Sequence, residues 1–204
     1  MTTTAKIALS DKELELVCNT DWILTKHSII QKVYELFGDV LPLLENELRQ
    51  KKNQLPEAIF IQSPKISKGE NYELLPWVML DYPRHFSKTA TLAIRTFFWW
   101  GNFFSVCLQL SGSTKVNAAD NIIKHYEWLQ TAGYFICVND NPWEHHFEPR
   151  NFIPISQLTK EEFSTIVLQQ SFVKIAKKIA VEEWERVPAF ITNVFTGLTG
   201  LLQK

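Results

Sequence analysis

The sequence lacks the motifs by which common enzyme and cofactor-binding families are recognised. Its 204 residues contain no GxGxxG fingerprint, no GxSxG nucleophile elbow and no HExxH zinc motif. Lys68 and Gly69 lie in SKGEN ahead of a predicted strand, whereas a phosphate-binding loop needs GxxxxGK[ST] ahead of a helix. No function can therefore be assigned from a motif alone.

Cysteine is scarce, and its spacing is not that of a disulfide framework. The three residues are Cys18, Cys107 and Cys137, an odd number with no CxxC pair. This spacing favours reduced thiols in a reducing compartment. Residues 1–13 also lack the apolar core of a signal peptide, so we expect a cytoplasmic location.

Neither sign of charge is in excess, and no hydrophobic run is long. The formal net charge is −1, whereas proteins that bind nucleic acids normally show a basic excess or a basic face. No window reaches the length of about 18 apolar residues that a transmembrane helix needs. We therefore expect neither a nucleic acid nor a membrane as a partner.

What the chain does contain is an ordinary globular composition, with 46% hydrophobic and 21% charged residues. Its length predicts a single domain spanning residues 1–204. Hydrophobic spacing and capping residues predict helices over 10–52, a sheet with a crossover helix over 55–138, a loop over 139–158 and C-terminal helices over 159–203. A helix break is expected near Gly38, with Pro42 in the first turn of the next helix, and a short strand at 58–62.

The strongest structural signal is the segment 89–112, TATLAIRTFFWWGNFFSVCLQLSG. Two runs of aromatic and β-branched residues flank Gly101-Asn102, which predicts a hairpin with a two-residue turn. Further strands are expected at 71–82 and 134–138. The chain is thus predicted to be an α+β protein, a mainly antiparallel sheet of about four strands with N-terminal and C-terminal helices packed on it.

Arg95 lies inside this hairpin. A two-residue turn would place it on the same face as Phe104, Val106 and Leu108, where a guanidinium needs a partner. An internal carboxylate is the first interpretation, and an anionic ligand is the alternative. The tryptophans near the hairpin have two interpretations as well, as core residues or as the lining of a ligand pocket.

Two polar segments follow predicted strands, Asp81–His85 and Trp143–Arg150. Loops at strand ends often carry function, and a histidine beside a carboxylate suits general acid–base catalysis. The candidate catalytic residues are Asp81, His85 and His145. The candidate ligand-binding residues are Arg84, Arg95, Trp143 and Arg150, because arginine binds carboxylates and phosphates and tryptophan offers a flat apolar surface.

A metal site is a further interpretation of the second segment. The candidate ligands are His145, His146 and Glu148, which are ligand types for zinc, iron or manganese without a motif spacing. The alternative is a solvated loop in which Glu144, Glu148 and Arg150 form surface ion pairs. We predict no cofactor, with a divalent metal as the alternative.

Residues 187–202 carry an apolar stripe at helical spacing. Core packing is the first interpretation, and a homodimer through this C-terminal helix is the second. A membrane surface fits less well because the segment lacks a basic face. Lys174, Lys177 and Lys178 are expected on the solvated side of the preceding helix.

Taken together, these features favour a non-enzymatic ligand-binding or protein-interaction module, whose partner is an unknown small molecule or protein. The alternative is a small hydrolase, with or without a metal, whose site combines the Asp81–His85 and Glu144–Arg150 loops. The absence of a catalytic motif favours the first.

Overall fold

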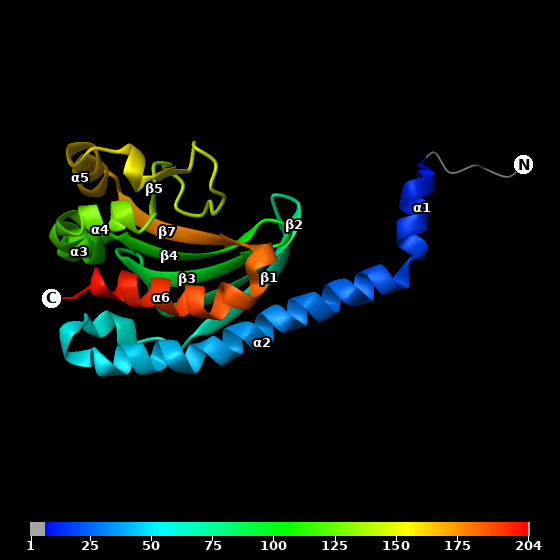
Figure 1. Cartoon of the computed structure of the whole chain (residues 1–204), viewed down its shortest axis with the longest axis horizontal. Coiled ribbons are helices and arrows are strands. Elements are labelled where there is room, and N and C mark those ends of the chain that lie inside the picture. Colours follow the sequence, from blue (N-terminus) through cyan, green and yellow to red (C-terminus); the bar gives the residue numbers. More distant parts are fainter. Residues whose placement is uncertain (1–6, 204) are drawn as a thin grey trace, which may run out of the picture.

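The computed structural model describes residues 7–203, in which seven antiparallel strands form one sheet and six α-helices accompany it (Figure 1). The strands, in spatial order, are β1 (Lys65–Tyr72), β2 (Leu75–Phe86), β3 (Thr91–Trp99), β4 (Phe103–Ser111), β7 (Phe172–Ala180), β5 (Phe135–Cys137) and β6 (Phe152–Pro154). The α+β class and the antiparallel sheet are confirmed. The expected number of strands, about four, was too small.

The largest error concerns β7, which was expected to be part of a C-terminal helix. Helix α5 (Lys160–Gln169) ends before it, and β7 then pairs with β4 on one side and β5 on the other. Beyond Gln169 the buried apolar residues Val173, Ile175 and Ile179 recur at even spacing, which is the period of a strand. Lys174, Lys177 and Lys178 therefore lie in the middle of the sheet and not on a helix.

Strand β1 and its surroundings also differ from the prediction. The short strand expected at 58–62 is absent from the described structure, because a 3₁₀ helix (Glu57–Phe60) occupies the start of this stretch, and β1 begins at Lys65. The sequence KISKGENY has little intrinsic strand preference, but β1 lies at the edge of the sheet and is stabilised by pairing with β2. Strand β6, at the opposite edge, lies within the segment predicted as a loop.

The β3–β4 hairpin has a three-residue turn and not the predicted two-residue turn. Trp99 lies opposite Phe103, and Gly101 takes a positive φ of 69°. A shift of one residue moves every side chain of a strand to the other face of the sheet. Arg95 therefore shares its face with Cys107, its direct neighbour on β4, and Leu108 points to the opposite face.

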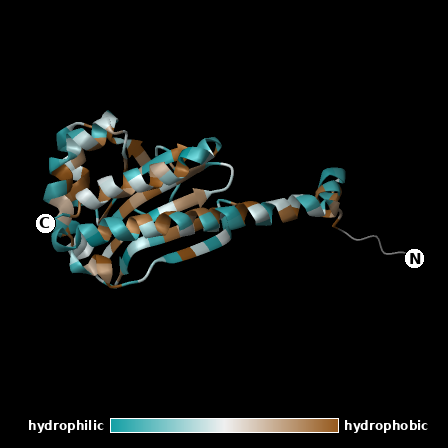
Figure 2. Ribbon diagram, turned by 60° about the horizontal axis from the view of Figure 1, so that its bottom comes forward, coloured by the Kyte–Doolittle hydropathy of each residue, from teal (hydrophilic) through white to brown (hydrophobic). Residues whose placement is uncertain are grey.

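Helices cover one face of the sheet and form the main core with it. Helices α2 (Thr20–Gln50) and α6 (Val187–Gly200) run side by side over the strands (Figure 2), and α3 (Gly112–Lys124), α4 (Tyr126–Thr131) and α5 complete the layer. The sheet contributes buried residues from four neighbouring strands: Val78, Leu80, Ile94, Phe98, Phe104, Val106, Leu108 and Ile175. The opposite face of the sheet carries the polar residues described below.

Helix α2 is continuous, so the expected break near Gly38 was wrong. Pro42 lies inside the helix, and a proline there removes one hydrogen bond. Phe37 and Leu44, on either side of Pro42, are both buried against the body of the protein, and this packing holds the helix together across the proline. At its other end α2 extends past the sheet and carries the short helix α1 (Asp11–Cys18) (Figure 1).

The apolar stripe of the C-terminal helix is part of the core. Val187, Ile191, Phe195 and Leu198 of α6 are buried in contact with α2 and the sheet. Dimerisation through this helix stays a prediction, but the residues that suggested it are covered within the chain. None of the described helices has both the length and the apolar character needed to cross a bilayer.

Candidate functional site

A belt of polar side chains crosses the sheet on the face away from the helices. It consists of Asp81 on β2, Arg95 on β3, Gln109 on β4 and Lys174 on β7. Asp81 lies directly opposite Arg95, and Gln109 lies directly opposite Lys174. The Arg95 guanidinium donates to both carboxylate oxygens of Asp81, at 2.7 and 3.4 Å, and to Gln109 Oε1 at 3.4 Å. Arg95 therefore has an internal carboxylate as its partner, as its first interpretation predicted.

Lys174 is the unusual member of the belt. Its side chain is fully buried, and Nζ donates to the backbone carbonyl of Glu144 and lies 5.2 Å from the ring centroid of Phe152. Within residues 7–203 no carboxylate lies within ion-pair distance of it. Burial lowers the pKa of Lys174, because water no longer solvates the ammonium.

Residues 138–151, here called the strap, form a long irregular segment between β5 and β6 that contacts the same face of the sheet. The hydroxyl oxygen of Tyr72, at the end of β1, accepts the backbone N–H groups of His145 and His146 at 2.6 and 3.1 Å. The amide of Asn151 donates to the carbonyl of His146 at 2.6 Å. The Tyr72 and Lys174 bonds attach the strap to the sheet at three consecutive residues, Glu144 to His146, and the Asn151 bond is internal to the strap.

His146 and Glu144 stabilise the strap from within. Nδ1 of the His146 ring accepts the backbone N–H of Glu148 at 3.3 Å, so Nε2 carries the proton that is donated to the Glu144 carboxylate at 2.8 Å. This bond lowers the pKa of Glu144. Asn139 donates to the same carboxylate at 2.8 Å. The polar groups of the strap are thus largely bonded to one another.

The three candidate catalytic residues lie in different surroundings. Asp81 is bonded to Arg95, whereas the β-bulge between Asp81 and Arg84 places His85 opposite Leu92, on the helix-covered face. The ring of His145 packs against Phe97 with centroids 5.0 Å apart, and burial holds its pKa well below the ordinary value. Asp81 and His85 therefore point to opposite faces of the sheet.

The candidate metal ligands are likewise not gathered around a point. His146 is bonded to Glu144, His145 packs between aromatic rings, and Glu148 forms an exposed ion pair with Arg150 at 3.1 Å. In the described part of the chain no group of three or more His, Cys, Asp or Glu side chains has an arrangement that could hold a metal.

The candidate ligand-binding residues are also dispersed. The Arg95 guanidinium lies beside the neighbouring rings of Phe86 and Trp143, at 5.7 and 5.4 Å from their centroids. Arg84 donates to the backbone carbonyl of Ser63 at 2.7 Å, and Arg150 is exposed beside its ion-pair partner. The exposed ring of Trp143 covers Arg95 from outside. These contacts account for the arginines within the chain itself.

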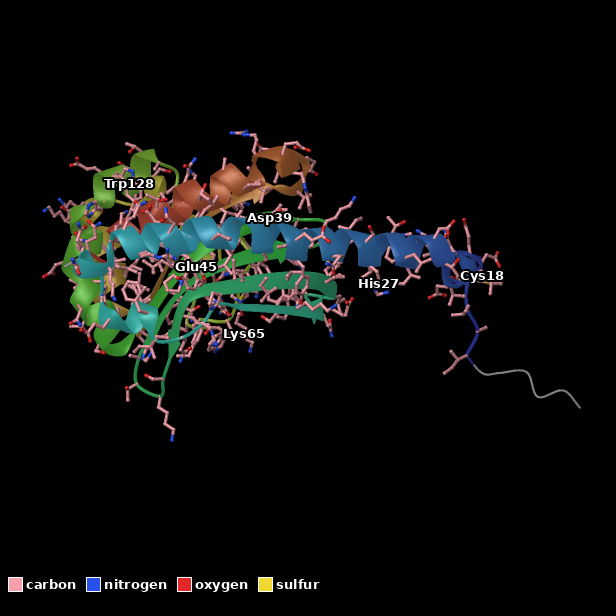
Figure 3. All side chains as sticks on the ribbon, turned by 90° about the horizontal axis from the view of Figure 1, so that it is seen from below. Cys18, His27, Asp39, Glu45, Lys65 and Trp128 are labelled. Carbon is pink, nitrogen blue, oxygen red and sulfur yellow. The ribbon has the colours of Figure 1, made fainter. Side chains whose placement is uncertain are left out.

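A second region, which the sequence did not single out, is the arm. It comprises residues 7–29, the described residues ahead of Ile30, where the first buried side chain occurs. Eight of the sixteen large hydrophobic side chains that are exposed in the described structure lie on the arm. They are Ile7, Leu9, Leu14, Leu16, Val17, Trp22, Ile23 and Leu24. The arm leaves the body on one side, with Cys18 at its far end and His27 along it (Figure 3).

Two apolar hollows adjoin Trp22 on the arm. One, of about 440 Å³, lies where α1 meets α2 and is lined by Leu16, Val17 and Ile23. The other, of about 460 Å³, is lined by the arm from Asn19 and Asp21 to Ile29 at its foot, and by Trp100 of the β3–β4 turn. The notch is our name for this second hollow. The arm therefore offers both protruding apolar side chains and recesses.

Sequence reasoning missed Lys174, Gln109, Tyr72 and the arm. The first two lie in strands whose face or type was misassigned, and Tyr72 acts through a hydroxyl that only the folded chain brings to the strap. A signal for the arm was present, because α1 and the start of α2 carry several large apolar residues and no glycine or proline separates them from the rest of α2 before Gly38. Only the structure shows that this stretch extends beyond the sheet in space and is therefore left uncovered.

No protein-family model, no curated protein and no solved structure matches this chain. The functional argument therefore rests on the geometry of the belt, the strap and the arm.

Proposed function

We propose that the protein is a non-enzymatic protein-interaction module and that the arm is its interaction surface. The observation that carries the proposal is the concentration of half of the exposed large hydrophobic side chains on residues 7–24. Contiguous exposed apolar patches are uncommon on soluble proteins unless another molecule covers them. Trp22, about half exposed between two hollows, has the character of an interface anchor.

The charges of the arm indicate the chemistry of its partner. Residues 11–21 carry four carboxylates and one lysine. An anionic lipid surface attracts helices with a basic polar face, so it suits this arm poorly. The partner that fits is a protein surface with an apolar recess and a basic rim, because complementary charge aids association and orientation.

The contacts of the belt and strap give less support to the hydrolase alternative. Asp81 is bonded to Arg95, and His85 lies on the other face of the sheet. Burial raises the pKa of Cys107 to about 11 and also raises that of Cys137, the opposite of what activates a thiol nucleophile. The three cysteines are free, and a cytoplasmic location stays part of the proposal.

Photo-crosslinking in the producing cell tests the proposal. A photoreactive amino acid replaces Val17 on the arm, and the matched control replaces Val116 on α3, since these valines are 68% and 72% exposed. We expect a discrete protein adduct from position 17 that is absent from position 116. The adduct should be lost with Trp22→Ser and retained with Trp143→Ser, because these tryptophans are 51% and 54% exposed.

Equal labelling at positions 17 and 116 would overturn the proposal, and so would an adduct that Trp22→Ser leaves unchanged. Crosslinking to lipid alone would overturn it as well.

A further inference from the structure

We infer that the partner of the arm is a second copy of this chain, with α1 of each copy seated in the notch of the other. The inference rests on the proposed function, since it names the occupant of the same surface. It draws on the shape of the arm, on the distribution of its charges and on the continuity of α2 with the core.

The arm carries complementary parts along its own length. Helix α1 presents Leu14 and Val17 to solvent, and the notch at the foot of the arm is a recess lined by Trp22, Ile29 and Trp100. A two-fold dimer requires such self-complementarity, because each copy must supply both the protruding part and the recess.

The distances along the helix are consistent with this exchange. The part of α2 in the arm, residues 20–29, is about 15 Å long at the rise of an α-helix. When two such segments lie antiparallel, the far end of each comes level with the foot of the other. Since α1 turns away from α2 at the far end (Figure 1), it then crosses the partner copy's α2 near the notch.

The charges oppose one another in the same arrangement. Helix α1 carries Asp11, Glu13 and Glu15 against one lysine, whereas residues 26–32 carry two lysines, one histidine and no carboxylate. Lys26 is bonded to Glu70 of its own chain, while Lys32 is exposed and has no ion pair among residues 7–203. Lys32 therefore supplies the basic group without an ion pair near the foot of α2 that the acidic α1 requires, and Asp21 is the one carboxylate among the residues that line the notch.

The apolar face of the arm also continues the face that packs in the core. Ile23 lies seven residues ahead of the buried Ile30, which in turn lies seven ahead of the buried Phe37. Residues seven apart lie on nearly the same side of an α-helix. The side of α2 that covers the sheet in the body is therefore left uncovered in the arm, where a second copy would cover it.

Charge reversal in the purified 204-residue chain tests the inference. We expect the wild-type chain to be a dimer at micromolar concentration by light scattering and sedimentation equilibrium. Glu15→Lys and Lys32→Glu should each weaken dimerisation by at least about tenfold, because like charges then meet. An equimolar mixture of the two variants should recover the wild-type dimer, because every α1 then meets a foot of opposite charge.

Two body variants provide the matched controls. Glu127→Lys on α4 and Lys88→Glu in the β2–β3 turn reverse the same charges at exposed positions away from the arm. Both should leave dimerisation unchanged. Circular dichroism of all four variants checks that they fold, which is expected because none of these side chains is buried.

A designed disulfide tests the seating of α1 directly. Residues 18 and 32 are separated by more than a disulfide can span within one chain, since α2 alone places about 18 Å between Thr20 and Lys32. In Lys32→Cys, oxidised by glutathione disulfide, Cys18 of one copy should therefore form a covalent dimer with the new cysteine of the other. Wild-type protein, which has Cys18 exposed and its other two cysteines buried, is the control.

A wild-type chain that stays monomeric, or a mixture that does not recover the dimer, would overturn the inference. The mass of the Val17 adduct then separates the two proposals. An adduct of another mass would leave the arm as an interaction surface for a different protein, whereas no adduct would overturn the proposed function too. An adduct of twice the mass of the chain supports both.

Discussion

Breaking the buried ion pair of Asp81 and Arg95 should destabilise the fold strongly. The two side chains are only 9% and 11% exposed, and the pair has two donor–acceptor contacts, at 2.7 and 3.4 Å. Arg95→Met retains most of the aliphatic length that packs beneath Trp143 but leaves the Asp81 carboxylate without a counter-charge. Removing one partner of a buried pair typically costs about 3–5 kcal/mol, because the other charge stays buried and uncompensated.

The double variant separates the interaction from the loss of each side chain. In Arg95→Met/Asp81→Leu no charge remains buried at this position, so its free energy of unfolding should lie within about 2 kcal/mol of the wild-type value. The double variant should thus lose less of the free energy of unfolding than either single variant does. Urea unfolding, followed by fluorescence and circular dichroism, measures all three variants under two-state conditions.

The exposed pair of Glu148 and Arg150 supplies the control. Its side chains are 65% and 64% exposed, so Arg150→Met should change the free energy of unfolding by less than about 1 kcal/mol. If Arg95→Met were as mild as this, or if the double variant were the sum of the single ones, Arg95 would not be held by Asp81. The ligand-binding interpretation of Arg95 would then regain support.

Three further predictions concern the belt, the strap and the hairpin region. Lys174→Met should raise the free energy of unfolding by about 1–2 kcal/mol in urea titrations. The gain from removing a buried ammonium that has no counter-charge is larger than the loss of its one hydrogen bond to a carbonyl. A lower free energy of unfolding would contradict this. The free energy of unfolding should fall as the pH is lowered below 6.5. Burial holds the pKa of His145 well below that value in the folded chain, so the unfolded chain takes up a proton that the folded chain does not. His145→Phe should reduce this slope by at most about 1.4 kcal/mol per pH unit, and an unchanged slope would show that His145 is solvated. Gly112→Ala should prevent stable folding, because at φ 59° a Cβ would lie 1.9 Å from the carbonyl oxygen of Thr89. Gly101→Ala should lower the free energy of unfolding by only about 1–3 kcal/mol, since no atom lies within 4 Å of its Cβ position. Thermal melts compare the two variants. Equal melting temperatures for the two glycine variants would refute that reasoning.

Features that depend on a few neighbouring residues could be predicted from the sequence. Capping boxes of Ser10 with Glu13 and of Thr159 with Glu162 are present, and Asn19 caps the start of α2. Each of these interactions is complete within four residues, so the local sequence specifies it. The two long strands of the hairpin were found for the same reason, through their aromatic and β-branched composition.

Features that depend on distant segments could not be predicted. The turn after Trp99 has one residue more than expected, and this single residue decides which face of β4 meets the helices. The strand conformation of residues 172–180 depends on insertion between β4 and β5, whose sequences lie far away. The belt combines both errors, because Gln109 lies on the misassigned face and Lys174 on the misassigned strand.

The candidate site residues could not be interpreted correctly from the sequence because their partners lie on distant segments. The residues first selected as chemically interesting are nearly all engaged within the chain, as Asp81 is with Arg95 and His146 is with Glu144. Their polarity is accounted for by the need to satisfy buried groups beneath the strap. Polar clusters in the sequence therefore corresponded to internal structure here, whereas half of the exposed large apolar side chains of the described structure lie on the arm, which the sequence analysis did not single out.

Substitutions on the arm can test association without changing the stability of the fold, whereas substitutions in the belt change stability itself. Since none of the side chains of residues 7–29 is buried, replacing Trp22 or Leu24 removes little that the single folded chain uses. Exposed substitutions of this kind usually change stability by less than about 0.5 kcal/mol. A loss of association in such variants therefore cannot be ascribed to unfolding. Leu24→Ser compared with Leu168→Ser on α5, at 62% and 58% exposure, makes the same distinction with a matched pair.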